Sequence, residues 1–391
     1  MTGALVAGVG MVKFAKPGAN EPYRVMAAAA IRQAIEDAGI APADIGQAYG
    51  GYIYGDSACA QHALYDVMMT GIPIVNVNNN CSSGSTALFL ARQAVESGAV
   101  ECALAFGFEE MPRGAMKSNW DDRESPGGAY VEKLDKWDYP EAPGAPRLFG
   151  AAGDYYMKTY DAKPDLFAQV AVKSRLHSTK NPMALFDQEL TVEEVMASPL
   201  VYGDYLTRLM CCPPTCGAAA AILCTPAFAK RHGLDHAVEI IGQGMASDTD
   251  SAWDNPMRLV GWGATNRAAK LAFEQAGLGP DDVDVVELHD CFTTNEVVSY
   301  EALGLCAEGG ATKLVADGDN TYGGKWVVNP SGGLMSKGHP IGATGLAQCY
   351  ELCMQMRNQA GTRQVERARV GLQHNIGVPG VAVVTLYRAL A

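Results

Sequence analysis

Basic side chains are a minority in this chain of 391 residues. Thirty lysines and arginines stand against 43 aspartates and glutamates, which gives a formal net charge of −13 at pH 7. Nucleic-acid binding depends on concentrated positive charge, so this balance argues against nucleic acid as the main partner. A local basic patch can still bind an anionic ligand on a surface of net negative charge.

Long apolar runs are also missing. No stretch of about 18 or more continuous apolar residues is present to span a bilayer. The opening residues, "MTGALVAGVGMVKFAKPG", hold too short an apolar run and no processing site, so we expect no signal peptide. The eleven cysteines are an odd number and are scattered rather than spaced as a disulfide framework. We therefore expect reduced thiols and a cytoplasmic location.

Signatures of metal and cofactor binding are incomplete. The run "CCPPTC" at residues 211–216 has no partner Cys-x-x-Cys, which makes it a weak zinc candidate. The run "GVGMV" at residues 8–12 lacks the third glycine of a dinucleotide-binding loop, and "YGGKW" is not a phosphate loop. The sequence predicts no metal and no permanently bound cofactor.

An internal repeat organises the chain. Residues 31–45, "IRQAIEDAGIAPADI", and residues 269–283, "AKLAFEQAGLGPDDV", share one pattern in which Gly39 matches Gly277. Each segment predicts an amphipathic helix that ends at glycine and is followed by a Pro-Asp turn and a strand. Strands that alternate with helices of this length predict an α/β fold with helices packed on sheets.

A second matched pair of segments contains two reactive residues. Residues 81–88, "CSSGSTAL", align without gaps with residues 339–346, "HPIGATGL", so that Cys81 matches His339. If a pseudo-twofold axis relates the halves, this thiol and this imidazole face each other across it. We place the halves at residues 1–236 and 237–391. Residues from about 113 to 210, rich in Trp, Tyr, Pro and charge, read as an inserted, irregular lid.

Cys81 is the first candidate catalytic residue. It lies where a helix begins within "NVNNNCSSGSTALFLARQAVESG", residues 76–98. A helix N-terminus stabilises thiolate and lowers a thiol pKa, and the small residues that follow leave room for a bulky acyl group. An ordinary core cysteine is the alternative. His339, on a Gly-Pro elbow, suits a general base near neutral pH, with a capping or surface histidine as its alternative.

Two further histidines follow apolar strands. "VDVVELHDCFTTNE" places His289 and Cys291 just beyond a strand, where α/β proteins gather reactive groups. A metal site is the competing interpretation, but no second spaced ligand pair is nearby. "QHNIG" offers His374 at another strand end, and a buried structural histidine explains that position equally well.

Taken together, these motifs resemble the thiolase superfamily along essentially the whole chain. The matching runs are "NNNCSSGSTAL", "ELHDCF", "TYGGKWVVNPSGGLMSKGHPIGATG" and "GLQHNIGVPGVAVVTLY". The His-Asp-Cys-Phe run is similar to the sterol carrier protein X type of thiolase, because most other thiolases carry Asn-Glu-Ala-Phe there. The resemblance implies the thiolase fold, an α/β fold of two duplicated halves in five αβαβα layers with an inserted loop domain. It also implies coenzyme A thioesters as substrates and a homodimer or tetramer.

The resemblance also implies roles for the candidate residues. His339 takes the proton of Cys81, whose thiolate attacks a 3-ketoacyl-CoA, and coenzyme A then removes the acyl group from the cysteine. Ordinary thiolases place a second, acidic cysteine in a C-terminal Cys-x-Gly turn, where this chain reads His374-Asn375-Ile376. Cys291 supplies that thiol instead. His289, with His339, stabilises the enolate oxygen, and the backbone N–H of Cys81 serves the other oxyanion.

The expected function is therefore thiolytic cleavage of a 3-ketoacyl-CoA with a branched or sterol-side-chain-like chain, which releases acetyl-CoA or propionyl-CoA. The alternatives are a carbon–carbon lyase or condensing enzyme of aldolase type, and a non-catalytic acyl-CoA-binding subunit. Both are disfavoured because the reactive residues are present. The sterol-carrier module of fused relatives is not among these residues, which suggests a separate lipid carrier or none. Pro379-Gly380 replaces a pair of glycines in those relatives and is expected to reshape the nearby loop.

Overall fold

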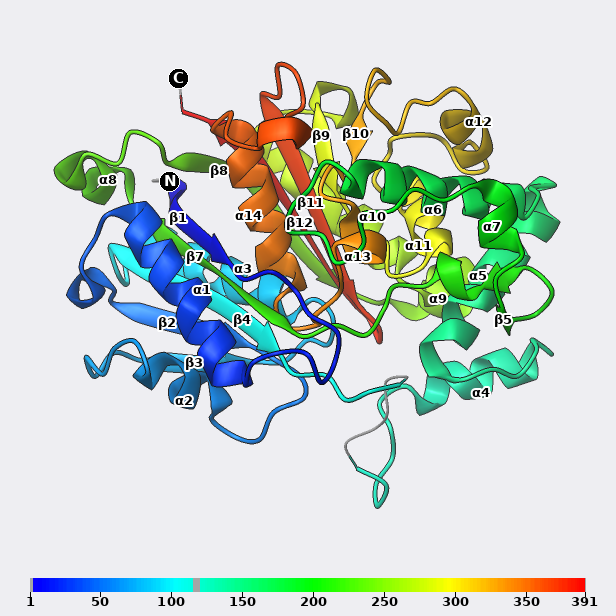
Figure 1. Ribbon diagram of the computed structural model, residues 1–391, viewed down its shortest axis with the longest axis horizontal. Helices are drawn as coiled ribbons and strands as arrows, with labels where there is room; N and C mark the ends of the chain where they lie inside the picture. Colours follow the sequence, from blue (N-terminus) through cyan, green and yellow to red (C-terminus); the bar gives the residue numbers. More distant parts are fainter. Residues whose placement is uncertain (1–2, 115–119, 391) are drawn as a thin grey trace.

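The computed structural model describes residues 3–114 and 120–390, in which strands and helices alternate (Figure 1). Five strands belong to the first half and lie in the order β3-β2-β4-β7-β1. They are β1 (Ala4–Met11), β2 (Gln47–Gly51), β3 (Ile74–Val77), β4 (Cys102–Glu109) and β7 (Gly217–Cys224). Strand β2 is parallel to β3 and β4, whereas β7 is antiparallel to β4 and β1.

The second half repeats this topology. Its strands lie in the order β10-β9-β11-β12-β8, with the same parallel and antiparallel neighbours at each step. They are β8 (Val238–Ser247), β9 (Val285–Glu287), β10 (Val327–Val328), β11 (Val370–Gly377) and β12 (Val381–Ala389). The shared order confirms the duplication that the sequence repeat predicts. The first strand of each half, β1 and β8, also pair with each other and join the halves into one sheet.

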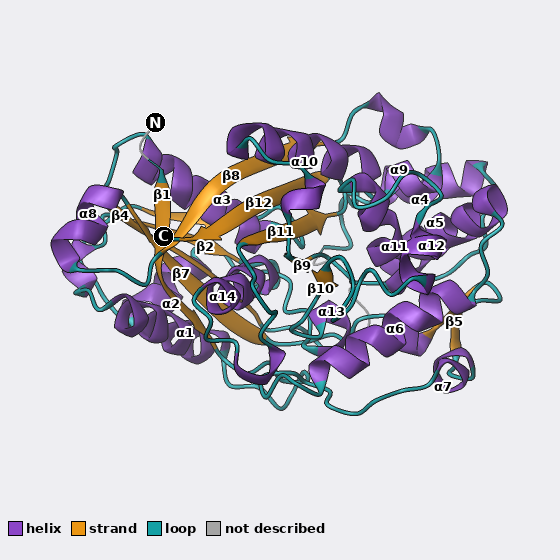
Figure 2. Cartoon of the chain, turned by 90° about the horizontal axis from the view of Figure 1, so that it is seen from above, coloured by secondary structure: helices purple, strands orange, loops and turns teal. Residues whose placement is uncertain are grey.

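Helices cover the strands in layers (Figure 2). Outer helices α1 (Tyr23–Ala38), α2 (Cys59–Tyr65) and α8 (Pro226–His232) pack on one face of the first half. Central helices α3 (Ser83–Glu96) and α14 (Thr344–Met356) lie between the halves and share one apolar cluster with strands of both. Outer helices α10 (Trp262–Ala276) and α11 (Thr293–Ala302) cover the second half. Because alternate residues of a strand point to opposite faces, each half contributes to an outer and to the central cluster. The five-layered thiolase fold is confirmed.

The matched glycines of the repeat have matched conformations. Helix α1 ends at Gly39 with φ 65°, and α10 ends at Gly277 with φ 64°. This left-handed conformation suits glycine and closes a helix. A short 3₁₀ turn follows each glycine, at Pro42–Asp44 and at Pro280–Asp282.

The two central helices meet at their N-termini. A Cβ atom built on Gly84 would lie 2.7 Å from the carbonyl oxygen of Gly342, the residue that the sequence alignment matches to it. Glycine is required here because the two backbones touch. The loops that carry Cys81 and His339 therefore converge, as the repeat predicts.

The segment between β4 and β7 differs from the irregular lid that its composition suggests. It contains helices α4 (Gly128–Lys136), α5 (Gly144–Tyr160), α6 (Asp165–Ser178) and α7 (Val192–Met196), and a small hairpin of β5 (Leu200–Tyr202) and β6 (Leu206–Thr207). Buried aromatic residues such as Phe149, Tyr156 and Phe167 pack these helices on the second half. Proline and charge are concentrated in the connections and on exposed helix faces, which hides the helical pattern in the composition.

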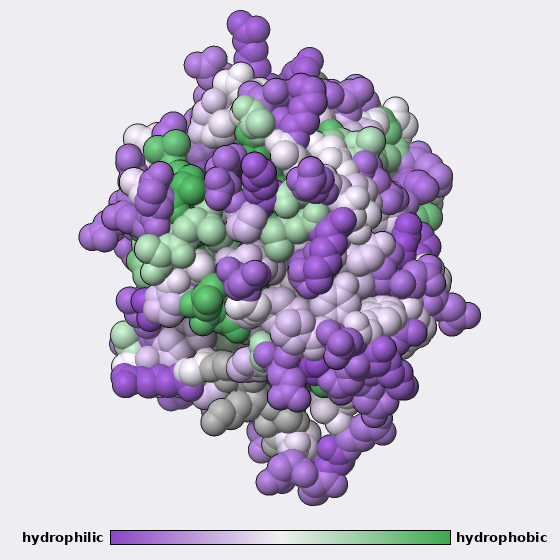
Figure 3. All heavy atoms as spheres, turned by 90° about the vertical axis from the view of Figure 1, so that its right-hand side faces the viewer, coloured by the Kyte–Doolittle hydropathy of each residue, from purple (hydrophilic) through white to green (hydrophobic). Residues whose placement is uncertain are grey.

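Short helices complete the structure: α9 (Pro256–Leu259), α12 (Ala311–Ala316) and α13 (Gly333–Ser336). The end of the molecule at the right of Figure 1 is mainly hydrophilic, with small hydrophobic areas between (Figure 3). Among the described residues, no helix combines the length and the hydrophobicity that crossing a membrane requires.

Candidate active site

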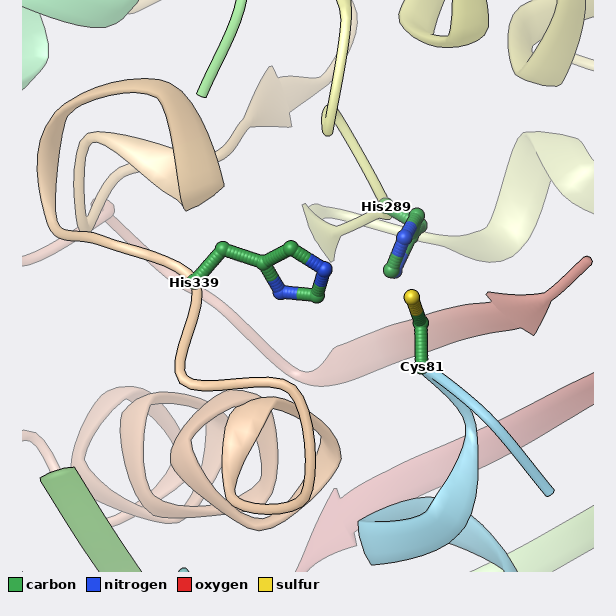
Figure 4. Close-up of side chains that lie close together, drawn as sticks. All are labelled: Cys81, His289 and His339. Atoms are coloured by element: carbon green, nitrogen blue, oxygen red, sulfur yellow. The ribbon is translucent and has the colours of Figure 1, made fainter. Parts of the chain in front are cut away.

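Three of the sequence-predicted residues come together at the meeting point of the central helices. The Sγ atom of Cys81 and one ring nitrogen each of His289 and His339 all lie within 4.8 Å of one another (Figure 4). Cys81 precedes α3, His289 follows β9, and His339 lies between α13 and α14. The duplicated fold thus gathers three segments that are distant in sequence.

Cys81 is partly exposed and follows a residue of unusual conformation. Asn80 has φ 50°, which asparagine tolerates better than most residues, and its side-chain amide donates to the carbonyl oxygen of Val378. Burial raises the pKa of the Cys81 thiol to about 12, and the charge of Glu109 raises it further. Burial and Glu109 thus act against the lowered pKa that the helix start predicts. The thiol is protonated and needs a base.

His339 has the hydrogen bonds of such a base. Its Nδ1 lies 2.7 Å from Oγ1 of Thr344, and that hydroxyl donates to the carbonyl oxygen of Pro340 at 3.0 Å. Because the hydroxyl hydrogen is used there, the Thr344 oxygen accepts the proton of Nδ1, and Nε2 keeps its lone pair. Burial lowers the pKa of His339 to about 3, so the ring is neutral. Its backbone N–H donates to Oγ1 of Thr215.

His289 is the opposite tautomer, with its proton on Nε2 instead of Nδ1. Its Nδ1 accepts from the side-chain amide of Asn375 at 2.8 Å, while Oδ1 of Asn375 accepts from the hydroxyl of Ser85 at 2.9 Å. The Ser85 contact fixes the orientation of the amide. Burial, with His339 and His374 nearby, lowers the pKa of His289. The neutral ring therefore carries its proton on Nε2 and is a hydrogen-bond donor.

The same three donor atoms are of the types that bind zinc. A zinc ligand must present a lone pair, however, and Asn375 places the proton of His289 on Nε2. The hydrogen bonds of the site thus favour a nucleophile, a base and a donor over a metal centre.

Cys291 lies beside this cluster. It is 6% exposed, and its carbonyl oxygen accepts from the backbone N–H of Cys212 at 2.9 Å. Burial raises the pKa of its thiol, and the neighbouring Cys212 and Cys81 thiols raise it further. A neutral thiol at this place is suited to donating a proton. The "CCPPTC" run, weak as a zinc motif, passes along the site, where Pro214 pairs with His339.

The structure does not bring His374 into the cluster. Its Nε2 lies 2.9 Å from Oγ1 of Thr265 on α10, on the face of β11 away from α14, and its Nδ1 has no hydrogen-bond partner among the described residues. The adjacent Asn375 points the other way and reaches His289. The catalytic role expected for His374 stays a prediction.

Three further residues of the site were missed. Thr344, Asn375 and Glu109 carry no motif of their own, and each acts through a contact that folding creates. The aligned Thr344 within "HPIGATGL" was the one available signal, since a hydroxyl at a helix start commonly bonds a nearby backbone or side chain.

Comparisons with known proteins agree with this geometry. The family model for the thiolase N-terminal domain matches residues 5–198, and the thiolase C-terminal domain-like model matches residues 245–387. Human sterol carrier protein 2 is 51% identical over 390 residues, which cover 98% of this chain and 71% of that protein. An acetyl-CoA acetyltransferase of Methanothermobacter thermautotrophicus is 36% identical, with 97% of each chain covered.

A solved structure described as an Ltp2-ChsH2(DUF35) aldolase superposes with a TM-score of 0.83 and covers 98% of this chain and 97% of that one. At 23% identity it shows the fold alone. The two family models together match most of the chain, and Cys81, His289 and His339 lie within the matched residues. The chain belongs to the thiolase family.

Proposed function

We propose that this chain is a 3-ketoacyl-CoA thiolase that works through an acyl-cysteine. The observation that carries the proposal is that the Cys81 thiol and two histidines of opposite tautomer lie within 4.8 Å of one another. One histidine presents a lone pair and the other an N–H. This is the arrangement needed to make a nucleophile and to hold an oxyanion.

The first step forms the acyl-enzyme. Nε2 of His339 takes the proton of Cys81, and the thiolate attacks the 3-keto carbon of the substrate. The backbone N–H of Cys81 donates to the oxyanion that forms. Collapse of this adduct breaks the C2–C3 bond and leaves the shortened acyl group on Cys81. The bonding electrons depart with the CoA thioester fragment as an enolate.

The enolate is then stabilised and protonated. Its oxygen receives hydrogen bonds from Nε2–H of His289 and from the protonated His339, and one such donor is typically worth about 3–4 kcal/mol. Cys291 gives its proton to C2, and acetyl-CoA or propionyl-CoA leaves. Cys291 becomes a thiolate for the next step.

Coenzyme A completes the cycle as the co-substrate. The Cys291 thiolate takes the proton of the incoming CoA thiol, whose sulfur attacks the acyl group on Cys81. Cys81 leaves as a thiolate and recovers its proton from His339. The products are the shortened acyl-CoA and a restored enzyme, with no metal or bound cofactor in any step.

The finer features of the proposal concern substrate and assembly. The His-Asp-Cys-Phe run supports a branched or sterol-side-chain-like acyl group. A homodimer or a tetramer is supported by β3, a sheet-edge strand on which Val75 is 44% exposed. The proposal also includes a cytoplasmic location, which the free cysteines of the described residues support.

An aldolase-type carbon–carbon lyase is the second candidate, because a protein described as an aldolase shares this fold. Such an enzyme needs no acyl-cysteine. The two functions therefore differ in whether Cys81 becomes covalently modified.

The deciding experiment measures the mass of the intact protein after brief incubation with a 3-ketoacyl-CoA in the absence of free CoA. We expect an acyl adduct on the wild type and none on Cys81→Ala. Cys306→Ala removes a partly exposed cysteine elsewhere and should keep the adduct. If several substrates bind but none leaves an adduct, the thiolase proposal fails and the lyase is favoured.

A further inference from the structure

A buried carboxylate lies behind the site and has no part in the mechanism above. Glu109 is the last residue of β4 and is fully buried. Its carboxylate accepts backbone N–H groups of Tyr54 at 2.8 Å, of Ile53 at 3.2 Å and of Gly342 at 3.0 Å. No cationic side chain of the described residues is among the groups that set its pKa. A buried carboxylate held only by backbone donors is costly and needs a reason.

The Gly342 contact connects Glu109 with the catalytic base. Gly342 lies in the same turn as His339, and this turn is held tightly on its other sides. A Cβ atom built on Gly342 would lie 2.5 Å from the carbonyl oxygen of Phe108 and 2.6 Å from that of Gly51. The carboxylate thus ties the turn to two strands of the first half.

Resting on the proposed function, we infer that Glu109 is a positioning residue of this reaction. Its carboxylate fixes the backbone of the Gly342 turn and thereby holds the imidazole of His339 in reach of the Cys81 thiol. The base comes from the second half of the chain and the nucleophile from the first. Glu109 is the first-half group that holds the second-half turn in register.

The position of Glu109 also has an electrostatic consequence. Burial raises the pKa of Glu109 to about 7 against the three N–H bonds that lower it, and its charge raises the pKa of Cys81. Among the described residues, Cys216 also has its pKa raised by the charge of Glu109. The next residue, Glu110, accepts the backbone N–H of Tyr23 instead. Ionised Glu109 therefore fixes the position of His339 through Gly342, and its charge disfavours the thiolate form of Cys81.

The variant Glu109→Gln tests both effects at once, because loss of the turn contact should lower kcat while loss of the charge should make the Cys81 thiolate easier to form. In Glu109→Gln, an amide N–H faces backbone N–H donors, so the turn loosens, and we expect kcat to fall at least about tenfold with KM changed by less than about threefold. The negative charge is also gone. Alkylation of Cys81 by iodoacetamide, followed by peptide mass spectrometry from pH 6 to 11, reports the thiolate fraction below the midpoint of the thiol. Alkylation about tenfold faster than in the wild type at each pH would correspond to the expected midpoint, lower by about one pH unit.

Glu110→Gln is the matched control, since it neutralises the adjacent, exposed glutamate and should change neither quantity. Glu109→Asp is the second variant: it keeps the charge but is one methylene too short to reach both sides, so kcat should fall without the shift in the alkylation midpoint. Thermal melting confirms that each variant is folded. Unchanged kcat in folded Glu109→Gln, or reduced kcat with an unshifted midpoint, would overturn the inference.

Failure of the thiolase proposal would look different. In that case the wild type itself forms no acyl adduct with a 3-ketoacyl-CoA, whereas the alkylation midpoints of wild type and Glu109→Gln still differ. A normal adduct that forms equally fast in wild type and Glu109→Gln refutes the role of Glu109 alone.

Discussion

His339 Nδ1 lies 2.7 Å from Thr344 Oγ1, and the same hydroxyl lies 3.0 Å from the carbonyl oxygen of Pro340. The hydroxyl can give its one hydrogen only once, so the pair of contacts decides which nitrogen of His339 is protonated. The Asn375 amide donates to Nδ1 of His289 and so places the proton of that ring on Nε2. Two imidazoles that lie close to one thiol are thus made chemically different by their hydrogen-bond partners.

The first prediction follows from this contact. In Thr344→Val, Nδ1 of His339 loses its acceptor and the ring can turn or change tautomer, so kcat should fall about 10–100-fold, the range typical when the partner of a functional histidine is lost. Thr344→Ser keeps the hydroxyl and should retain most activity. Steady-state kinetics on both variants test this, and full activity in the valine variant would contradict the assignment of the base.

The second prediction concerns the donor. In Asn375→Asp, a carboxylate faces Nδ1 of His289 and draws the proton to that nitrogen, so Nε2 no longer donates to the enolate. Loss of one oxyanion donor costs about 10²–10³ in kcat. Asn358→Asp, an exposed change of the same kind, is the control. Comparable rates for the two variants would show that His289 does not act through Nε2–H.

The sequence predicts those residues of the site that belong to a local motif, and not those that depend on contacts between distant segments. Cys81 and His339 are found because each begins a repeated loop-to-helix motif, and the repeat itself implies that they meet. Glu109 and Asn375 are not found, because their partners lie in distant segments and only the fold brings them together. His374 and Asn375 are neighbours on β11, and a strand pattern without its register does not say which of the two faces His289.

The same limit applies to the fold. The repeat predicts two halves with the same layers, and the observed strand order agrees. Composition alone does not show helices α4 to α7, because proline and charged residues are concentrated in the connections between them and on exposed helix faces. The pKa of Cys81 shows the same limit: the helix start that favours a lower pKa is visible in the sequence, whereas the burial and the Glu109 charge that raise it are not.

The third prediction tests His374 as a structural residue. Burial lowers its pKa to about 3, so the unfolded chain binds a proton below about pH 6.5 that the folded chain does not bind. Wild-type stability should therefore fall as pH decreases from 6.5 toward 3, by about 1.4 kcal/mol per pH unit for this residue. His374→Gln lacks this proton uptake, so its stability deficit relative to wild type should shrink by that amount on acidification.

Urea unfolding at pH 4.5, 5.5 and 6.5 measures this difference. The variant should also keep its catalytic rate near pH 7, because the ring of His374 contacts Thr265 and not the Cys81 cluster. A large loss of kcat in a stable His374→Gln protein would return His374 to the catalytic set.

The last prediction concerns a buried ion pair that supports the loop carrying His289. Lys173 on α6 pairs with Glu296 on α11, with side chains 7% and 0% exposed. Glu296 also accepts from the amide of Asn329, whose Oδ1 accepts the backbone N–H of Leu288 at 2.8 Å. The ion pair is therefore connected through the side chain of Asn329 to Leu288, the residue before His289.

Because removal of one partner strands a buried charge, Lys173→Met should lower the free energy of unfolding by about 3–5 kcal/mol. The double variant Lys173→Met/Glu296→Gln leaves no charge and should recover part of that loss. Lys158→Met, which breaks an exposed pair with Asp154, should cost less than about 1 kcal/mol. Urea unfolding of the wild type, Lys173→Met, Glu296→Gln and the double variant measures the coupling, with Lys158→Met as the control. If the double variant is less stable than Lys173→Met by the full cost of Glu296→Gln alone, the two side chains act independently and the loop is held by its backbone contacts.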